Sequence, residues 1–560
     1  MYISKIYIKN YKLYKEQIIK FNPQCNIFVG NNNSGKSTLL ETLQIVMMGR
    51  LDGVSFENKI KANIFNNQIR NEFKESIKSD NLTIKKLPEI IIEIYFNIEE
   101  EDDTCQALTM KQKEGNNNQL RETSTGIQMK LSYDLNFSET IQKLIENKFI
   151  NDIPIEYYSA KWTFFNADII KSFRQIPLKI ALIDTTKREY GTYMNRYINK
   201  SMMEYLTEEE HKSLSLSYHN LRTDFTNTDE IIDLNKKIET YKISEHKVEF
   251  IASEPERNEW KDDISISVDN IPFENLGFGF QNLIKLGLAV KEKAEKFGII
   301  LFEEPENNLS FSNMSKLIAT IKATDNQQKF ITTHSSYVAN KLNLSNLILL
   351  NNGVPAIFKS ISNDTIDYFI KLPGYNTLRM FLAKKSILVE GPSDELIIQR
   401  SYLDSYSKLP IEEGIDVISV RALAFKRYLE LAIIAKTKTV VVTDNDGDIQ
   451  KLKARYSDYL DYIFYEKNSS LKTLEPSIVE VNFKSETDTV NFISIIKEKQ
   501  ISEIRQMILS QYEGWNDPKL KNYIIKWMTT PINKTKWSLR VFSSTKKIKY
   551  PEYIIDAIKK

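Results

Sequence analysis

A glycine-rich loop at residues 30–38 (GNNNSGKST) constrains the fold of this chain more than any other stretch. It follows an apolar run at 27–29 that is typical of a buried strand, and it precedes an apolar run at 39–43 that is typical of a helix. This setting predicts a P-loop, whose backbone N–H groups surround phosphates. Lys36 would reach the β- and γ-phosphates, and the Ser37 hydroxyl would ligate Mg²⁺. A plain surface turn is the alternative. The candidate nucleotide-binding residues are Gly30, Asn31, Asn32, Asn33, Ser34, Gly35, Lys36, Ser37 and Thr38.

The composition is that of a globular protein, with 41% hydrophobic and 27% charged residues. Its 560 residues are enough for about three to four domain-sized units. The net charge of +2 identifies no partner, but residues 517–560 hold eleven Lys and Arg against three Asp and Glu. Such a basic segment suits a nucleic-acid backbone, and a solvated helical face is the equal alternative.

Cysteine usage and hydropathy indicate the compartment. The two cysteines, Cys25 and Cys105, form neither a CxxC pair nor a zinc-spaced cluster, which fits a reducing environment. The lysine-rich N-terminus is unlike a signal peptide, and no apolar run approaches the roughly 18 residues of a membrane helix. We therefore expect a soluble cytoplasmic protein.

The pattern of secondary structure changes near residue 380. Before that point the sequence predicts a loop at 99–125, mostly helices over 138–245 and a helix over 281–296. From residue 384 short strands alternate with helices, which implies a parallel sheet. The strands expected before residue 380 are 2–11, 16–21, 26–30, 89–98 and 126–135 (the last two antiparallel), 246–253, 264–273, 298–304 and 329–334.

A second candidate ATPase element is the apolar strand that begins at residue 298 and ends in two carboxylates, Glu303 and Glu304. In a Walker B arrangement Glu303 would hold Mg²⁺, mainly through water, and Glu304 would act as general base toward the attacking water. Buried strands that end in acidic residues are common, so this interpretation depends on the P-loop upstream.

Two weaker motifs complete the set. Gly277 and Gly279 form a turn before a helix, where Gln281 and free N–H groups would face a phosphate. His334 ends a strand and would sense a γ-phosphate. Taken alone, the first motif would be an ordinary strand-to-helix turn and the second a core histidine.

In this order the four elements resemble the ATP-binding-cassette ATPases of the SMC, Rad50 and RecF type. The resemblance implies that residues 275–281, although they lack the usual Ser-Gly-Gly form, are the signature motif that binds ATP held on the other protomer. It also implies a D-loop at 305–309 and a switch histidine at His334. ATP sandwiched between protomers implies a dimer.

Acidic groups follow two apolar strands of the C-terminal region. Glu390 (in EGPSD) follows one strand, and Asp444 and Asp446 (in DNDGD) follow another. The carboxyl ends of parallel strands are where a doubly wound sheet opens its site, and oxygen ligands there suit Mg²⁺ or Mn²⁺. A calcium loop is the alternative for DNDGD, but Arg455 stands where an EF-hand needs Glu.

These three acids resemble the site of Toprim domains. An ABC-type ATPase followed by a C-terminal Toprim domain is the arrangement of the OLD (overcoming lysogenization defect) family, which includes Gabija and retron-associated nucleases. The resemblance covers nearly the whole chain. It implies that Asp394 and Glu475 also bind metal. It further implies that a C-terminal lysine, matched to Lys534 with Lys536 as its rival, stabilises the scissile phosphate.

The OLD resemblance implies an α/β chain of four parts. They are an ATPase N-lobe (1–137), a helical dimerisation insert (138–245), an ATPase C-lobe (246–380) and a Toprim nuclease domain (381–560). The catalytic residues would be Glu390, Asp444, Asp446 and Lys534 for DNA cleavage and Glu304 for ATP hydrolysis.

The function implied is an ATP-regulated, metal-dependent DNA endonuclease of antiphage defence. It would use ATP and Mg²⁺ or Mn²⁺ and would form a homodimer or homotetramer. Its partners would be DNA and a separately encoded UvrD-like helicase or a retron reverse transcriptase with its msDNA. Two alternatives stay open, each with an inactive Toprim: an ATP-sensing DNA-binding scaffold and a DNA-repair ATPase of RecF type.

Overall fold

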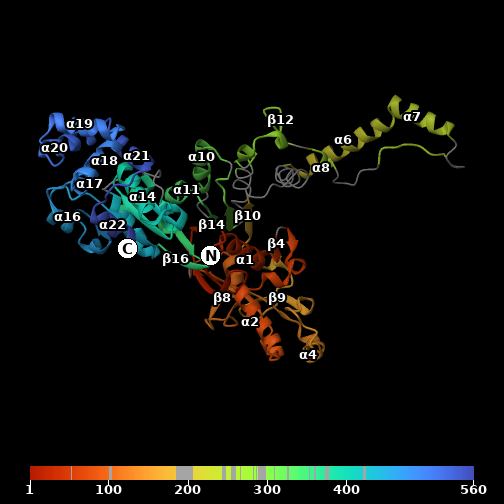
Figure 1. Cartoon of the computed structure of the whole chain (residues 1–560). Helices are drawn as coiled ribbons and strands as arrows, with labels where there is room; N and C mark the ends of the chain where they lie inside the picture. Colours follow the sequence, from red (N-terminus) through yellow and green to blue (C-terminus); the bar gives the residue numbers. More distant parts are fainter. Residues whose placement is uncertain are drawn as a thin grey trace. The chain divides into compact units, whose positions relative to one another are not determined.

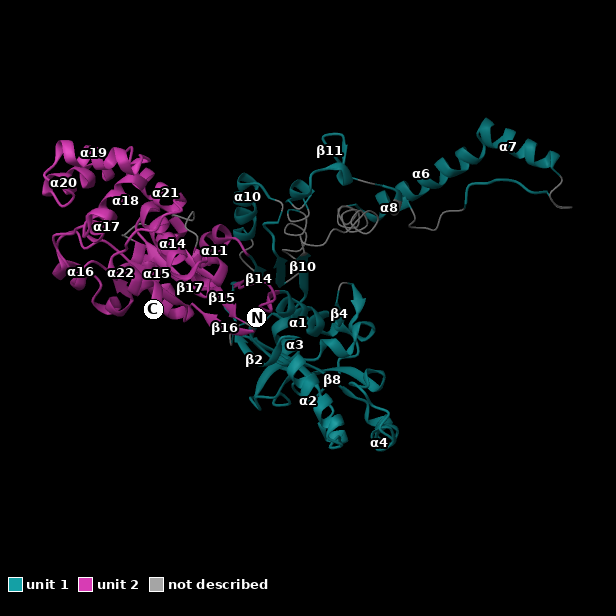
Figure 2. Cartoon of the chain, in the orientation of Figure 1, with its two compact units in different colours: residues 1–26, 37–333 teal, residues 27–36, 334–560 magenta. Residues whose placement is uncertain are grey.

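The chain forms two compact units, which Figure 2 shows in different colours: residues 1–26 with 37–333, and residues 27–36 with 334–560. No described helix is long and apolar enough to cross a membrane. The computed structural model describes residues 1–51, 53–99, 102, 104–184, 206–241, 247–253, 260–264, 266–281, 283–284, 287, 298–307, 309–323, 327–351, 353–358, 361–371, 377–420 and 424–560.

An antiparallel sheet forms the first part of the N-terminal unit. Its strand order is β2-β1-β6-β8-β7, and β9 also pairs with β8. Ile6, Ile94 and Ile127 lie opposite one another on three neighbouring strands, and all three are fully buried. This apolar ladder fixes the register, because a slip by one residue would turn it to the other face. The strands are β1 (Tyr2–Tyr11), β2 (Tyr14–Lys20), β6 (Ile90–Asn97), β7 (Glu114–Gly115), β8 (Ser124–Tyr133) and β9 (Tyr158–Phe164).

The strands predicted within residues 2–135 are confirmed, including the antiparallel pair β6 and β8. The helical assignment of residues 138–245 is wrong for β9 and for β10 (Ile180–Asp184). Every second residue of β9 is buried, a period of two that a helix does not have. The loop expected at 99–125 contains a short helix, α3 (Cys105–Lys111). The dimerisation role of 138–245 stays a prediction.

A parallel set of strands, β10-β13-β14, carries the predicted Walker B element of the N-terminal unit. Its other members are β13 (Ile299–Glu303) and β14 (Gln328–Thr332). Among the described residues the helices of this unit are α1 (Lys36–Met48), α2 (Asn67–Lys78), α3, α4 (Ser138–Glu146), α6 (Glu208–Thr226), α7 (Asp229–Thr240), α8 (Trp260–Asp263) and α10 (Phe311–Lys322); all except α3 are labelled in Figure 1. Two short hairpins join β4 (Arg50–Leu51) to β5 (Val54–Ser55) and β11 (Ser267–Val268) to β12 (Ile271–Pro272).

Two strands predicted in the middle of the chain do not form as expected. Residues 247–253 form no strand, and residue 246 lies outside the described residues. Of the strand expected at 264–273, only the two-residue β11 and β12 form. The helix predicted over 281–296 falls largely on residues that the structure does not describe, and its described start is at residue 278.

The C-terminal unit contains the P-loop strand β3 (Cys25–Val29), which is parallel to β15 (Leu347–Asn351); β15 pairs antiparallel with β16 (Val354–Ile357). Its second sheet is fully parallel, as predicted, in the order β18-β17-β19-β20. These strands are β17 (Lys385–Val389), β18 (Ile415–Ser419), β19 (Lys438–Val442) and β20 (Ile463–Phe464). Because β18 and β19 flank β17 on opposite sides, the switch point of this sheet lies between β17 and β19.

Helices surround the parallel sheet and tie the chain end to it. Lys385 at the start of β17 donates from Nζ to the carbonyls of Ala557 and Ile558, each at 2.8 Å, at the end of α22. The helices are α11 (Ser336–Lys341), α12 (Asn363–Lys371), α13 (Thr377–Leu382), α14 (Pro392–Tyr406), α15 (Phe425–Ala435), α16 (Ile449–Arg455), α17 (Leu474–Asn482), α18 (Glu486–Lys497), α19 (Ile501–Gln511), α20 (Pro518–Met528), α21 (Lys536–Ser543) and α22 (Glu552–Lys559).

Candidate functional site

Two acidic residues meet at the switch point of the parallel sheet. Glu390 directly follows β17, and Asp444 follows the neighbouring strand β19. The Glu390 carboxylate accepts hydrogen bonds at its Oε1 atom from the Thr443 hydroxyl (2.6 Å) and from the Asp444 backbone N–H (3.0 Å). The ends of the two strands are therefore joined through the Glu390 side chain.

Two helix N-termini bring further carboxylates to this point. Asp394 lies in the first turn of α14 and accepts from the Gly391 backbone N–H at 3.1 Å. Glu475 lies in the first turn of α17, is 5% exposed and accepts from the Thr473 hydroxyl at 2.9 Å. Both positions favour negative charge, because the first N–H groups of a helix point at them.

The five carboxylates predicted to bind metal in the Toprim domain form one electrostatic group, which we call the acidic cluster: Glu390, Asp394, Asp444, Asp446 and Glu475. Burial, and then the charges of Glu390 and Glu475, raise the pKa of Asp394 to about 7. Burial, and then the charges of the four other members, Asp394 foremost, raise the pKa of Asp444 to about 9. The structure thus brings these residues close enough to oppose one another's ionisation.

The donor chemistry of the acidic cluster fits a hard divalent cation. Its side chains offer only carboxylate oxygens, which suit Mg²⁺ or Mn²⁺, and a cation between them would offset the repulsion that helps to raise the pKa values of Asp394 and Asp444. Within the described residues, no three His, Cys, Asp or Glu side chains are positioned as a ready set of metal ligands. The carboxylates would therefore turn toward an ion on binding.

The loop that carries Asp444 and Asp446 is held by the residue between them. The buried Asn445 amide donates to the carbonyls of Glu466 (2.8 Å), Asn468 (3.0 Å) and Leu471 (3.3 Å), in the segment after β20. Asp446 itself is exposed and has a positive φ of 49°. It therefore lies at the solvent side of the cluster.

The segment that contains Lys534 and Lys536, which we call the lysine segment, is predicted to contact the phosphate and is held beside Asp394. The Ser393 hydroxyl, at the start of α14, donates to the Lys534 carbonyl at 2.7 Å. The ammonium-bearing side chains of Lys534 and Lys536 are both exposed. Further along α14 the Arg400 guanidinium donates to the carbonyls of Phe542 (2.9 Å) and Lys546 (3.2 Å), so the segment follows this helix.

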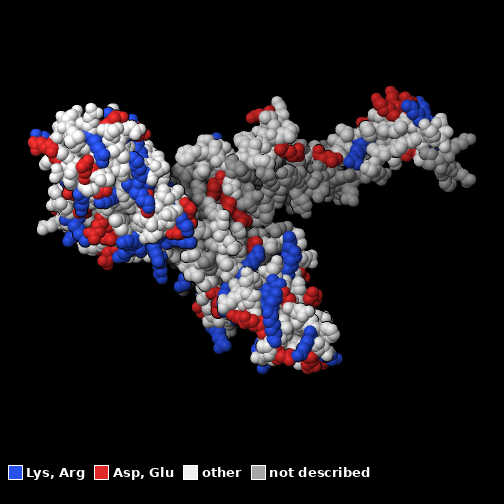
Figure 3. All heavy atoms as spheres, in the orientation of Figure 1, with Lys and Arg blue, Asp and Glu red and all other residues white. Residues whose placement is uncertain are grey.

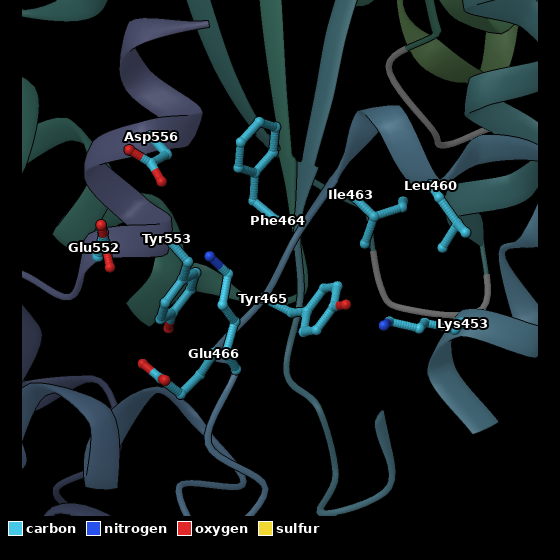
Figure 4. A pocket seen from close by; sticks show the side chains of 10 residues that line it. Lys453, Leu460, Ile463, Phe464, Tyr465, Glu466, Glu552, Tyr553 and Asp556 are labelled. Carbon is cyan, nitrogen blue, oxygen red and sulfur yellow. The ribbon is translucent and has the colours of Figure 1, made fainter. Parts of the chain in front are cut away.

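A cavity of about 340 Å³ lies along the open edge of β20. Figure 4 shows α22 on one side of the strand and Lys453 and Leu460 on the other. The Tyr553 side chain adjoins the acidic cluster, since burial and the charges of Asp444 and Asp394 raise its pKa. Three carboxylates and two lysines give the cavity a mixed charge. The lining residues are Lys453, Leu460, Ile463, Phe464, Tyr465, Glu466, Lys467, Glu552, Tyr553 and Asp556.

The predicted P-loop has the backbone that phosphate binding requires. Asn33 and Gly35 adopt positive φ values of 62° and 104°. A Cβ on Gly30 would lie 2.4 Å from the Leu350 carbonyl, so only glycine fits there. The buried Lys36 ammonium donates to the carbonyls of Gly30 (3.0 Å) and Asn31 (3.1 Å), and α1 begins at Lys36. The conformation is that of a phosphate-binding loop with its lysine folded back.

The predicted Walker B acids end a buried strand. Glu303 is the last residue of β13. Glu304 has a positive φ of 42°, its N–H donates to the Thr332 carbonyl at 3.1 Å, and its carboxylate accepts from the Asn307 amide at 2.9 Å. His334 follows β14 and is exposed. In the predicted D-loop, residue 308 lies outside the described residues.

The glycine turn has a local structural explanation. The Gln281 amide is buried and donates to the carbonyls of Phe273 (2.9 Å) and Leu276 (3.0 Å), so it holds its own turn together. Gly277 precedes a helical turn at 278–281, and Gly279 lies within it. Contact of these residues with ATP stays a prediction.

Comparison with known proteins now adds the family. Residues 1–339, more than half of the chain, match the model of the AAA ATPase domain. The chain belongs to the AAA ATPase domain family. Residues 381–446 match a second model, the overcoming lysogenization defect protein-like TOPRIM domain. An AAA ATPase domain followed by an OLD-like TOPRIM domain confirms the predicted fold class and the resemblance to OLD-family proteins.

Several individual proteins are similar to this AAA ATPase and TOPRIM chain. Endonuclease GajA of Bacillus cereus (strain HuB5-5) is 23% identical over 525 residues, which cover 79% of this chain and 74% of GajA. The DNA replication and repair protein RecF of Clostridium botulinum (strain 657 / Type Ba4) is 22% identical over 395 residues, which cover 63% of this chain and 99% of RecF. The solved C-terminal region of the Xanthomonas campestris pv. campestris OLD protein is 19% identical, covers 32% of this chain and 93% of its own, and has a TM-score of 0.23.

The TOPRIM site includes residues that the sequence did not single out. Thr443, Asn445 and Ser393 hold the acidic cluster and the lysine segment through hydrogen bonds, and Arg400 fastens that segment along α14. Thr443, Asn445 and Ser393 adjoin the predicted acids in sequence, so their positions were the one available signal. Arg400 lies in an ordinary helix and gave none.

Proposed function

We propose that the chain is a DNA endonuclease whose TOPRIM domain cuts DNA at the acidic cluster under the control of its ATPase domain. The observation that carries the proposal is the convergence of five carboxylates at the switch point, where burial and mutual repulsion raise the pKa of Asp394 to about 7 and that of Asp444 to about 9. Similarity to Endonuclease GajA over 79% of the chain supports an endonuclease reaction, and the resemblance to the OLD family implies a role in antiphage defence.

The residues of the cluster have separable roles in this proposal. Divalent cations held there would supply positive charge opposite the phosphodiester and make water a better nucleophile. Glu390 is held by Thr443 and by the Asp444 N–H, so it can present its second oxygen in a fixed direction. A cation would also favour the ionised form of Asp444, whose pKa is raised to about 9 by burial and by the other acids. Asp394 and Glu475 complete the oxygen donors.

Lys534 is the proposed phosphate contact of the cluster. Its carbonyl bonds to Ser393, one residue from Asp394, whereas Lys536 already begins the next helix. An exposed ammonium there can neutralise charge that develops on the non-bridging oxygens during cleavage. We therefore assign this role to Lys534 and treat Lys536 as the rival.

ATP is the proposed regulator. The Lys36 ammonium would exchange its two carbonyl acceptors for phosphate oxygens, and Ser37 in the first turn of α1 would contact Mg²⁺. We assign Glu303 to Mg²⁺ binding, Glu304 to general base catalysis, and Gly277, Gly279, Gln281 and His334 to γ-phosphate contacts. A cytoplasmic location, a homodimer or homotetramer, and a UvrD-like helicase or retron reverse transcriptase as partner stay untested predictions.

A second candidate function is that of a DNA-repair ATPase with an inactive TOPRIM. The similarity to RecF, which spans 99% of that protein, favours it. The intact acidic cluster argues against an inactive TOPRIM domain, because a site without activity is not expected to hold five mutually repelling carboxylates together.

One assay separates the two candidates. Purified protein is incubated with supercoiled plasmid and Mg²⁺ or Mn²⁺, with and without ATP, and with EDTA as control. The endonuclease proposal predicts nicked or linear plasmid only with a divalent cation and a rate that changes with ATP. A plasmid left intact under every cation and nucleotide condition would reject it in favour of the RecF-type candidate.

A further inference from the structure

The turn between α20 and α21, residues 529–535, exposes one large apolar side chain. Ile532 is 83% exposed and follows Pro531. The lysines on either side, Lys526, Lys534 and Lys536, are also exposed. Among the described residues none of these three ammonium groups forms an ion pair. The turn thus presents an isoleucine surrounded by unneutralised positive charge.

The backbone of this turn is fixed by its own hydrogen bonds. The N–H groups of Asn533 (3.0 Å) and Lys534 (2.9 Å) both donate to the Thr530 carbonyl. The Asn533 amide donates to the Thr530 hydroxyl (2.9 Å) and to the Trp527 carbonyl (3.2 Å). Pro531 fixes its own φ, and the β-branched side chain of Ile532 is restricted at χ1, so Ile532 has little freedom to lose at χ1 on contact with a ligand.

The turn is also fixed relative to the acidic cluster. The bond from the Ser393 hydroxyl to the Lys534 carbonyl (2.7 Å) joins it to the first turn of α14, next to Asp394. The C-terminal part of the segment is fastened to α14 by Arg400. Ile532 therefore stands at a fixed distance from the place where the proposed function puts the scissile phosphate.

Exposure alone would mean nothing, because single apolar residues are common on protein surfaces. Leu509 of α19, for example, is 82% exposed in the same unit. Its neighbours along the cavity on α19 are Arg505, Gln506 and Ser510, and in the described part of the chain its side chain has no hydrogen bond to the acidic cluster. Ile532 differs in combining exposure, a rigid turn, flanking lysines and attachment to α14. Leu509 is therefore a matched control.

We propose that Ile532 is a wedge that inserts between two base pairs beside the cut and unstacks them. This inference rests on the proposed function, since it needs DNA at the acidic cluster. Isoleucine is one of the apolar side chains that proteins use to open a base step, and the flanking lysines would hold the phosphates of both strands. Cutting would then favour flexible pyrimidine–purine steps, which unstack at the lowest cost.

The test first maps the cuts of the parent protein on plasmid DNA. A short duplex with that sequence then carries 2-aminopurine at the step next to the cut, since its fluorescence rises when it unstacks. It is bound, with Ca²⁺ in place of Mg²⁺, to the parent protein, Ile532→Ala, Ile532→Phe and Leu509→Ala. We expect a several-fold rise with the parent, with Ile532→Phe and with Leu509→Ala, and none with Ile532→Ala. Where the mapped cuts are dispersed, the probe is placed at several steps.

Cleavage gives an independent readout. Ile532→Ala should cut the matched duplex on the order of tenfold more slowly, because the side chain that helps to unstack the step is gone. A mismatch at the step should restore its rate, since a mismatched pair costs less to unstack. If the parent cuts DNA and Ile532→Ala shows the same fluorescence rise and the same cleavage rate, the wedge proposal is overturned and the proposed function stands. A parent that neither binds nor cuts DNA overturns the proposed function and the wedge with it.

Discussion

The P-loop and the acidic cluster differ in how their buried charged groups are compensated. In the P-loop the Lys36 ammonium is buried but already bonded to two backbone carbonyls, at 3.0 and 3.1 Å. In the acidic cluster several carboxylates accept hydrogen bonds, but among the described residues no positive charge balances them, and burial and the neighbouring carboxylates raise the pKa of Asp444 to about 9. The buried ammonium of the P-loop therefore has hydrogen-bond acceptors without a ligand. The carboxylates of the acidic cluster repel one another in the folded state unless protons or cations reduce their charge.

This difference has a practical meaning. On the face of the C-terminal unit that Figure 3 shows, lysine and arginine side chains are spread with acidic atoms in patches between them, so the surface charge of this face does not mark either site. The balance of charge inside each site distinguishes the two. Substitution of the hydrogen-bonded P-loop lysine should change the stability of the protein little and weaken nucleotide binding strongly. Substitution of a carboxylate in the acidic cluster should raise the stability and strongly lower the rate of DNA cleavage.

The largest contrast should come from Asp444→Ala. It removes a ligand that lies among all other members of the cluster, so DNA cleavage should fall by at least about 10³-fold. ATP hydrolysis should stay within roughly twofold of the parent, because no P-loop or Walker B group is touched. Plasmid cleavage and phosphate release measure the two activities, with the exposed Asp461→Ala as control. Parental cleavage by Asp444→Ala would mean that the cluster is not the cutting site.

The P-loop side of the comparison is tested by Lys36→Ala and Glu304→Gln. Lys36→Ala should weaken ATP binding by at least about 100-fold, since a charge-assisted contact with phosphate disappears. Glu304→Gln should bind ATP normally and hydrolyse it about 10²- to 10⁴-fold more slowly, because an amide cannot act as general base. Calorimetric titration and phosphate release report the two steps. Equal hydrolysis by Glu304→Gln and the parent would remove Glu304 from the role of base.

The two lysines of the C-terminal turn sharpen the assignment on the nuclease side. Lys534→Ala should lower the cleavage rate about 10²- to 10³-fold with nearly unchanged DNA affinity, because its charge matters most in the transition state. Lys536→Ala should be milder. Single-turnover cleavage and equilibrium DNA binding separate rate from affinity. The reverse ranking would move the phosphate contact to Lys536.

The smallest effect is on stability and has a defined sign. Raised carboxyl pKa values mean that the folded state binds more protons than the unfolded state, so stability without divalent cations should fall as pH rises from about 4 toward 9. Asp444→Asn should flatten this decline and raise Tm at pH 8 by a few degrees, at about 2–4 °C per kcal/mol. Thermal scans in EDTA measure it, with Asp461→Asn as control. An unchanged pH profile for Asp444→Asn would show that the acids do not repel as described.

Short-range patterns of the sequence were enough to predict much of this architecture. The strands β1, β6, β8, β17 and β19 follow from apolar runs between polar turns, and the acids that come after β17 and β19 follow from the rule for parallel sheets. The strand β9 was missed because its alternation lies between segments with helical patterns, and its partner β8 is 25 or more residues away. The role of Arg400 was missed because its partners in the lysine segment are main-chain carbonyls, which carry no sequence signal.

The hydrogen bond from Ser393 to Lys534 has a consequence for the chain during its synthesis. It links residues 141 positions apart, and the bond from Lys385 to Ala557 links residues 172 positions apart. During translation the acidic residues leave the ribosome well before the segment with the lysine and the last helix. If Lys534 acts as proposed, a nascent or prematurely terminated chain holds acids without their phosphate contact. The protein would then be unable to damage the genome of the cell that is still making it.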